Sequence, residues 1–295
     1  MKRYKDVLGD GGSNIAGQLA EQQRRLGARM AGIRRTIAIV SGKGGVGKSA
    51  ITANLAAALA ADGYAVGALD ADLNGPSLAK MLGVRGQTLR VTDSGVAPAV
   101  SAAGIRVLSM DLLLPSDETP VLWEAPTQAE AHTWRGTMEA NVLREFLTDT
   151  VWGTLDLLLL DLPPGADRLP TVTDLVPDLT GAIVVTIPSE ISHLVVKKSI
   201  ALAREAKAPL LGLVENMAGY VCVGCGRLGT LFEGPGGERT AAQLGIPFLG
   251  RIPFDPRLAA AADHGRPFVL DCGESLAGRA LRAIAARLAE TLARP

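Results

Sequence analysis

The stretch that decides the fold is residues 37–49, Ile-Ala-Ile-Val-Ser-Gly-Lys-Gly-Gly-Val-Gly-Lys-Ser. Its first four residues are apolar and mostly β-branched, which is typical of a buried strand. Residues 54–61, rich in alanine and leucine, follow the glycines and predict a helix. Strand, glycine loop and helix in this order are the context in which a Gly-x4-Gly-Lys-Ser pattern forms a phosphate-binding loop. The chain is therefore expected to bind a polyphosphate here.

The glycine loop supplies the groups that a polyphosphate needs. Its glycines allow the backbone to take positive φ and to turn its N–H groups inward, and a helix N-terminus near Lys48 adds partial positive charge. Lys48 is expected to reach the β- and γ-phosphates, and the Ser49 hydroxyl to bind Mg²⁺. A glycine-rich turn without a ligand is the disfavoured alternative. The predicted nucleotide-binding residues are Gly42, Lys43, Gly44, Gly45, Val46, Gly47, Lys48 and Ser49.

A second cation, Lys43, follows the first glycine of the loop. Its path back to the phosphates held by its own loop is too short, so it faces either solvent or the nucleotide of a partner chain. Residues 42–49 resemble the deviant Walker A motif of the MinD/ParA/nitrogenase iron-protein class. That resemblance implies an ATP-bridged homodimer in which Lys43 acts in trans on catalysis, beside Lys48.

Length and composition favour one α/β domain. Strand and helix patterns alternate from residue 36 to 252, and aromatic residues are scarce while small aliphatic residues dominate, as expected for helices on a doubly wound, mostly parallel sheet. The formal net charge of zero argues against non-specific nucleic-acid binding. No apolar run reaches about 18 residues, and the N-terminus lacks a secretory signal. A cytoplasmic protein without stable membrane association is expected.

The two ends of the chain are expected to differ. Residues 1–35 are predicted as a basic leader, flexible or a peripheral helix, and residues 36–295 as the P-loop ATPase domain. A basic amphipathic helix within the leader could instead lie on anionic lipid. Residues 274–292 form an apolar stripe that predicts a helix docked on the sheet, with membrane attachment as the alternative.

Two acids, Asp70 and Asp72, follow the second predicted strand, residues 65–69. The carboxyl ends of parallel strands gather ligands, so both acids should lie near the phosphate loop. Residues 70–77 resemble the Mrp/ApbC branch, whose members carry Asp-Ala-Asp-x-x-Gly-Pro-Ser. The resemblance implies that Asp72 orients the attacking water and that Asp70 supports the Mg²⁺ shell. Capping of the next turn is the alternative for both.

A third acid, Asp161, ends a run of four leucines and precedes Pro-Pro-Gly. This is the Walker B arrangement, in which a buried strand holds a carboxylate near Mg²⁺. The branch continues Thr-Gly-Asp, whereas this chain has Ala166-Asp167-Arg168, which leaves the behaviour of this switch open. Thr137 likewise replaces the proline of the branch's Trp-Arg-Gly-Pro-Met, and a helix is predicted from Met138 onward.

Asn216 and a Cys-x2-Cys pair close the set of candidate residues. Asn216 stands where the branch reads adenine. Cys222 and Cys225 on one turn can chelate, but Zn²⁺ and a [4Fe–4S] cluster each need four ligands. Nothing marks Cys272 or His264 as completing the set, whereas a two-fold homodimer supplies four cysteines. A redox pair or half a zinc site is the alternative.

The resemblance to the Mrp/ApbC branch spans roughly residues 36–270. It implies a weak ATPase that holds a bridging [4Fe–4S] cluster in a homodimer and delivers it to apo iron–sulfur proteins. The alternative function is a MinD- or ParA-like switch, whose ATP-dependent dimer acts on membrane, DNA or a partner protein. That alternative leaves the two cysteines without a purpose.

Overall fold

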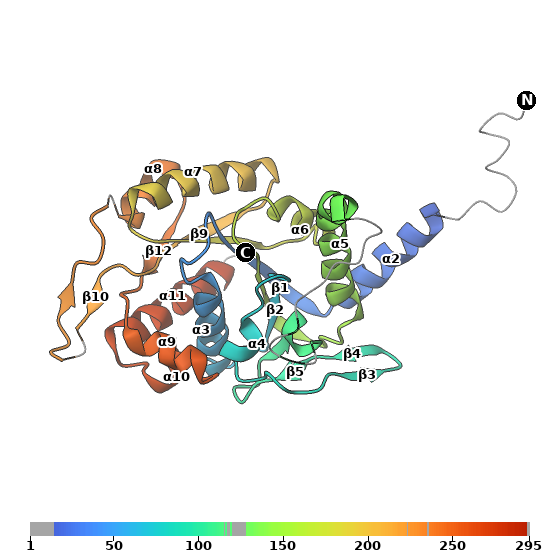
Figure 1. Ribbon diagram of the computed structural model, residues 1–295, viewed down its shortest axis with the longest axis horizontal. Helices are drawn as coiled ribbons and strands as arrows, with labels where there is room; N and C mark the ends of the chain where they lie inside the picture. Colours follow the sequence, from blue (N-terminus) through green and yellow to red (C-terminus); the bar gives the residue numbers. More distant parts are fainter. Residues whose placement is uncertain are drawn as a thin grey trace, which may run out of the picture.

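A computed structural model describes residues 15–114, 116, 119, 128–222, 224–234 and 236–293 (Figure 1). Eight strands form one sheet in the order β12-β9-β8-β1-β7-β2-β6-β5, and every neighbouring pair is parallel except β5 with β6. The predicted doubly wound, mostly parallel sheet is confirmed. The strands are β1 (Ile33–Ser41), β2 (Val66–Asp70), β5 (Ala99–Val100), β6 (Arg106–Leu108), β7 (Leu155–Asp161), β8 (Gly181–Thr186), β9 (Leu210–Glu215) and β12 (Phe248–Arg251).

Helices cover both faces of the sheet, and side chains of β1 alternate between the two cores. Ile37 and Ile39 pack on one face, where the helices are α3 (Lys48–Ala61), α4 (Leu78–Met81), α9 (Pro256–Asp263), α10 (Phe268–Asp271) and α11 (Leu276–Ala293). Ala38 and Val40 pack on the other, where the helices are α2 (Ile15–Met30), α5 (Gln128–Asp149), α6 (Leu169–Leu175), α7 (Glu190–Glu205) and α8 (Gly237–Leu244).

Two short hairpins lie outside the main sheet. Strands β3 (Arg90–Thr92) and β4 (Gly95–Ala97) pair across a turn at Asp93 and Ser94. Strand β10 (Tyr220–Val221) pairs with β11 (Leu228–Gly229) around the cysteines. In the main sheet, β6 ends at Leu108 and gives way to the short 3-10 helix η1 (Met110–Leu112), because the Ser109 side chain accepts the Asp111 N–H and caps a turn.

Helix α5 begins ten residues earlier than the prediction of Met138. Thr137 permits this, because it keeps the backbone N–H and lacks the ring with which a proline in a helix interior would clash against the carbonyl four residues earlier. The predicted docking of the C-terminal helix is confirmed, since Leu281, Ile284 and Leu288 of α11 are buried against the sheet side. In the described part of the chain, no helix is long and apolar enough to cross a membrane.

The predicted leader includes α2, which lies against α5. Leu26 of α2 is buried, Arg25 forms an ion pair with Asp149 at 2.8 Å, and the Arg29 guanidinium donates to the Thr148 carbonyl at 2.9 Å. Strand β1 begins at Ile33, three residues before the expected domain start. Residues 1–14 lie outside the described residues, and the division into leader and ATPase domain stays a prediction.

Candidate functional site

The phosphate loop connects β1 to α3 as predicted, but its glycines serve different purposes. Gly45 and Gly47 take the positive φ values of 77° and 83° that favour glycine. Gly42 and Gly44 do not have positive φ, which corrects that part of the prediction. Gly42 is required by close packing, because a Cβ there would lie 2.5 Å from Val195 Cγ1 of α7.

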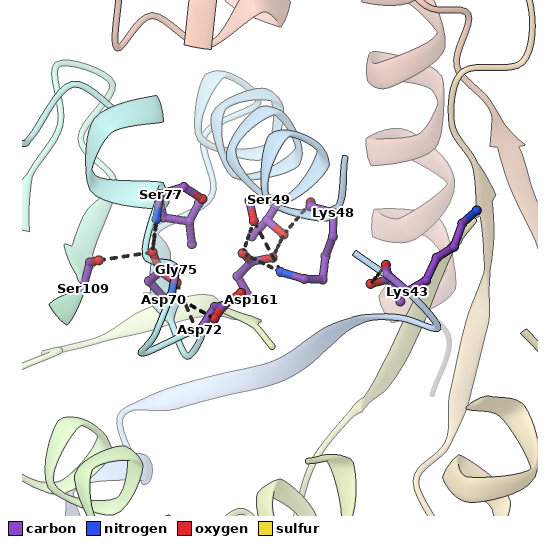
Figure 2. Close-up of polar contacts among 12 residues, drawn as sticks. Lys43, Lys48, Ser49, Asp70, Asp72, Gly75, Ser77, Ser109 and Asp161 are labelled. Carbon is purple, nitrogen blue, oxygen red and sulfur yellow. Dashed lines mark hydrogen bonds and ion pairs between the residues drawn. The ribbon is translucent and has the colours of Figure 1, made fainter. Parts of the chain in front are cut away.

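Lys48, Ser49 and Asp161 converge at the N-terminus of α3 (Figure 2). Lys48 Nζ lies 2.8 Å from Asp161 Oδ2, and the Ser49 hydroxyl donates to the same oxygen at 2.6 Å. The Asp161 side chain is fully buried and that of Lys48 is 6% exposed. The Thr52 hydroxyl donates to Asp161 Oδ1 at 2.7 Å and was not predicted, although it follows Ser49 by three residues on the same helix face.

Asp70 ends β2 beside Asp161 and is also fully buried. Its Oδ2 accepts hydrogen bonds from the backbone of Ser77 and Leu78 at 2.8 and 3.0 Å and from the Ser109 hydroxyl at 3.1 Å. Burial, and next the charge of Asp161, raise the pKa of Asp70 to about 7. The hydrogen bonds from Ser77 and Leu78 lie at the start of α4, so Asp70 caps the turn that follows it, as in the alternative reading. The role in the Mg²⁺ shell stays a prediction.

Asp72 and Lys43 flank this cluster in different ways. Asp72 lies half-buried in the loop after β2, where its Oδ1 accepts the Gly75 N–H at 3.2 Å. In the view of Figure 2, Asp72 lies just below Asp161, whereas the Lys43 side chain extends away from both. The Lys43 side chain thus lies apart from Lys48 and Asp161 in this structure. The roles of Asp72 in hydrolysis and of Lys43 in trans stay predictions.

Asn216 follows β9 and contacts the phosphate loop directly. Its Nδ2 donates to the Val46 carbonyl at 2.8 Å, and its backbone N–H donates to the Thr186 carbonyl at 2.7 Å. A Cβ on Gly47 would lie 2.3 Å from Asn216 Nδ2, so glycine is needed there for space as well as for φ. This contact was not predicted, and the reading of adenine by Asn216 stays a prediction.

The two cysteines lie on the turn between β10 and β11. The Gly226 N–H donates to the Cys222 carbonyl at 2.7 Å, and the Cys222 N–H donates to the Arg227 carbonyl at 3.0 Å, which closes a tight hairpin. Cys222 is partly exposed and Cys225 is exposed. Hydrogen bonds from the backbone N–H groups of Cys225 and Gly224, and then from the Cys225 thiol, lower the pKa of Cys222. This turn therefore favours a thiolate, the form that binds metal.

The cysteine hairpin is held by the loop after β12. The Ala218 N–H donates to the Ile252 carbonyl at 2.9 Å, and the Phe254 N–H donates to the Gly219 carbonyl at 2.7 Å. The rings of Tyr220 and Phe254 stack with centroids 6.3 Å apart. The hairpin projects at the edge of the molecule, near α9 (Figure 1). Among the described residues, no group of three or more His, Cys, Asp or Glu side chains is placed to hold a metal.

The chain is similar in sequence and in fold to proteins of known name or structure. A protein from Methanocaldococcus jannaschii named iron-sulfur cluster carrier protein is 46% identical over 259 residues, 87% of this chain and 86% of its own. A nucleotide-binding protein from Archaeoglobus fulgidus, solved in complex with ADP, is 36% identical, with a TM-score of 0.70 over 83% of this chain and 92% of its own. The cell division ATPase MinD from Pyrococcus furiosus shares the fold, with 24% identity and a TM-score of 0.60 over 87% of this chain and 99% of its own.

The family model described as ParA, NUBPL iron-transfer P-loop NTPase, matches residues 32–289. This range begins just before β1 and ends within α11, so it includes the phosphate loop, the three acids and the cysteine hairpin. The chain belongs to the NUBPL family of iron-transfer P-loop NTPases.

Proposed function

We propose that this protein is an iron–sulfur cluster carrier, in which ATP binding and hydrolysis govern delivery of the cluster to apo-proteins. The observation that carries the proposal is the hairpin that presents Cys222 and Cys225. Cys222 lies six residues beyond Asn216, whose side chain is bonded to the phosphate loop. The name of the Methanocaldococcus relative supports the same cargo. The cluster is the substrate of this activity.

The N-terminus of α3 is suited to a nucleotide with Mg²⁺. The Ser49 hydroxyl and the Asp161 carboxylate are hard oxygen ligands of the kind that Mg²⁺ prefers, and they lie within hydrogen-bond distance of each other. Bound Mg²⁺ would supply positive charge to the phosphates. Lys48 would leave its ion pair with Asp161 and reach the phosphates as a point charge, while Asp72 would orient the attacking water.

A homodimer would complete both sites. Lys43 points away from its own phosphate loop, which suits a role at the nucleotide of a partner chain. One chain offers two closely spaced thiols, and a two-fold axis beside the hairpins would bring four together, the number that a [4Fe–4S] cluster needs. The lowered pKa of Cys222 favours the thiolate in this role.

Asn216 provides a route from nucleotide to cluster. Its side chain bonds to the Val46 carbonyl in the phosphate loop, and the chain runs from it through Met217, which has a φ of 55°, into the hairpin. If the phosphate loop rearranges around ATP, the hydrogen bond from Asn216 to the Val46 carbonyl would change, and with it the position of the segment that leads to the cysteines. We propose that this changes how firmly the dimer holds the cluster.

Anaerobic reconstitution with iron and sulfide tests the proposal. Wild type is expected to take up about four irons per dimer with visible absorption. Cys222→Ser should abolish this uptake, whereas Cys272→Ser, the matched control outside the hairpin, should not. Iron uptake that survives Cys222→Ser would contradict the cluster site. ATP-dependent sedimentation with anionic vesicles or DNA, without iron uptake, would favour the MinD- or ParA-like switch instead.

Coupling is tested with the loaded protein and an apo iron–sulfur acceptor. Cluster transfer should depend on ATP in wild type and lose that dependence in Lys48→Met. Equal transfer by both proteins in the presence of ATP would show that the nucleotide does not govern delivery.

A further inference from the structure

The loops that follow β2 and β7 are joined by one side chain from a third element. Glu139 lies in the middle of α5 and is 8% exposed. Its Oε1 accepts a hydrogen bond from Asn74 Nδ2 at 2.9 Å, and its Oε2 forms an ion pair with the Arg168 guanidinium. Each carboxylate oxygen of Glu139 thus binds a different loop.

Both loops belong to the nucleotide site. Asn74 lies two residues after Asp72, in the turn that Asp72 Oδ1 closes by accepting the Gly75 N–H. Arg168 directly precedes α6, in the segment that follows Asp161. Asp70 and Asp161, at the ends of the two strands, are register partners in the sheet. Glu139 therefore forms a second link between chain segments that already leave the sheet side by side.

The burial of Glu139 makes this link costly to break. A buried carboxylate that loses a charged partner keeps its desolvation penalty, and charge-assisted hydrogen bonds are about twice as strong as neutral ones. Arg168 is 28% exposed, so its ion pair is only partly screened by water. Movement of one loop at bound nucleotide should therefore draw the other with it.

We propose that Glu139 is a positioning residue for ATP hydrolysis. By holding Asn74 and Arg168 together, it makes the Asp72 turn and the segment after Asp161 rearrange as one unit around the γ-phosphate. The inference rests on the proposed ATPase activity. Because the link acts through geometry at the hydrolysis step, its loss lowers kcat and leaves the KM for ATP nearly unchanged.

The test is a set of steady-state ATPase measurements on the full chain. Glu139→Ala, Asn74→Ala and Arg168→Ala should each lower kcat roughly 10-fold, with KM within about 2-fold of wild type. The double variant Asn74→Ala/Arg168→Ala should be no slower than either single variant, because breaking one end already uncouples the loops. Glu145→Ala, at an exposed position of α5, is the matched control and should behave as wild type.

Contradictory outcomes are distinct. If the losses of kcat in the single variants multiply in the double variant, the two loops act independently and the inference is overturned. A changed KM with unchanged kcat would also overturn it, because Glu139 would then act on ATP binding and not on hydrolysis. Thermal unfolding of the nucleotide-free variants identifies a folding defect, and Glu139→Gln, which keeps an acceptor for Asn74, then carries the test with an expected loss of kcat from the broken ion pair. If wild type hydrolyses ATP no faster than Lys48→Met, the proposed function falls with the inference. If wild type is active and Glu139→Ala equals it, the inference alone falls.

Discussion

Replacing Lys48 by methionine isolates the buried ion pair at the nucleotide site. Methionine keeps most of the apolar stem of lysine and removes the charge. The fully buried Asp161 carboxylate then retains only the hydroxyl hydrogen bonds of Ser49 and Thr52, at 2.6 and 2.7 Å, among its described contacts. We expect the nucleotide-free protein to lose stability as well as activity.

The structure sets the magnitude of this loss. At 2.8 Å between Nζ and Oδ2, the Coulomb energy is about 6 kcal/mol for an effective dielectric constant of about 20. Breaking a buried pair by removing one partner typically costs 3–5 kcal/mol. The two hydroxyl donors to Asp161 favour the lower end, about 3 kcal/mol. For a chain of 295 residues, a melting temperature roughly 5 °C below wild type follows.

A double-mutant cycle measured by thermal and urea unfolding checks this reasoning. Lys48→Met should be clearly less stable than the double variant Lys48→Met/Asp161→Asn, since the second change removes the unpaired charge. Lys80→Met, at an exposed position of α4, is the control and should melt within about 1 °C of wild type. A Lys48→Met protein as stable as this control, or a double variant that loses the sum of both single effects, would refute the buried pair.

Three further predictions follow from individual contacts. Burial is the main cause that raises the pKa of Asp70 from 3.8 to about 7, so between these pH values the folded protein keeps a proton that the unfolded chain releases. The free energy of unfolding, measured by urea titration, should therefore fall as pH rises from about 4 to about 7, and Asp70→Asn should flatten that fall. In equilibrium unfolding, Gly47→Ala should lower the free energy of unfolding by about 1 kcal/mol more than Gly63→Ala. Both glycines have positive φ, but only a Cβ at position 47 would meet another side chain, at Asn216 Nδ2. With the other two cysteines changed to serine, the rate of alkylation of Cys222 should rise with pH at a midpoint below the usual thiol pKa of about 8.5, because backbone N–H groups of the turn stabilise its thiolate. A midpoint at the usual thiol pKa would exclude that stabilisation.

Local sequence signals predicted much of this molecule because they act over short distances. The β-branched run before Gly42, the glycines and the alanine-rich segment after Ser49 determine strand, loop and helix through propensity and φ preferences alone. The acids at positions 70 and 161 end apolar strands, and a parallel sheet gathers such ends at one edge. The early start of α5 was missed, since a single Thr137 decided whether the helix could continue.

Contacts between distant segments could not be predicted, because they depend on how the layers pack. Nothing near Asn216 in the sequence indicates its bond to the Val46 carbonyl, 170 residues away. The same holds for Glu139, whose partners lie in two loops on either side of it along the chain. The sequence by itself determined the fold class, the phosphate loop and the chelating pair, since these need only neighbouring residues. Only the tertiary structure decided which buried charges meet, because burial and pairing are properties of the packed sheet and its helices.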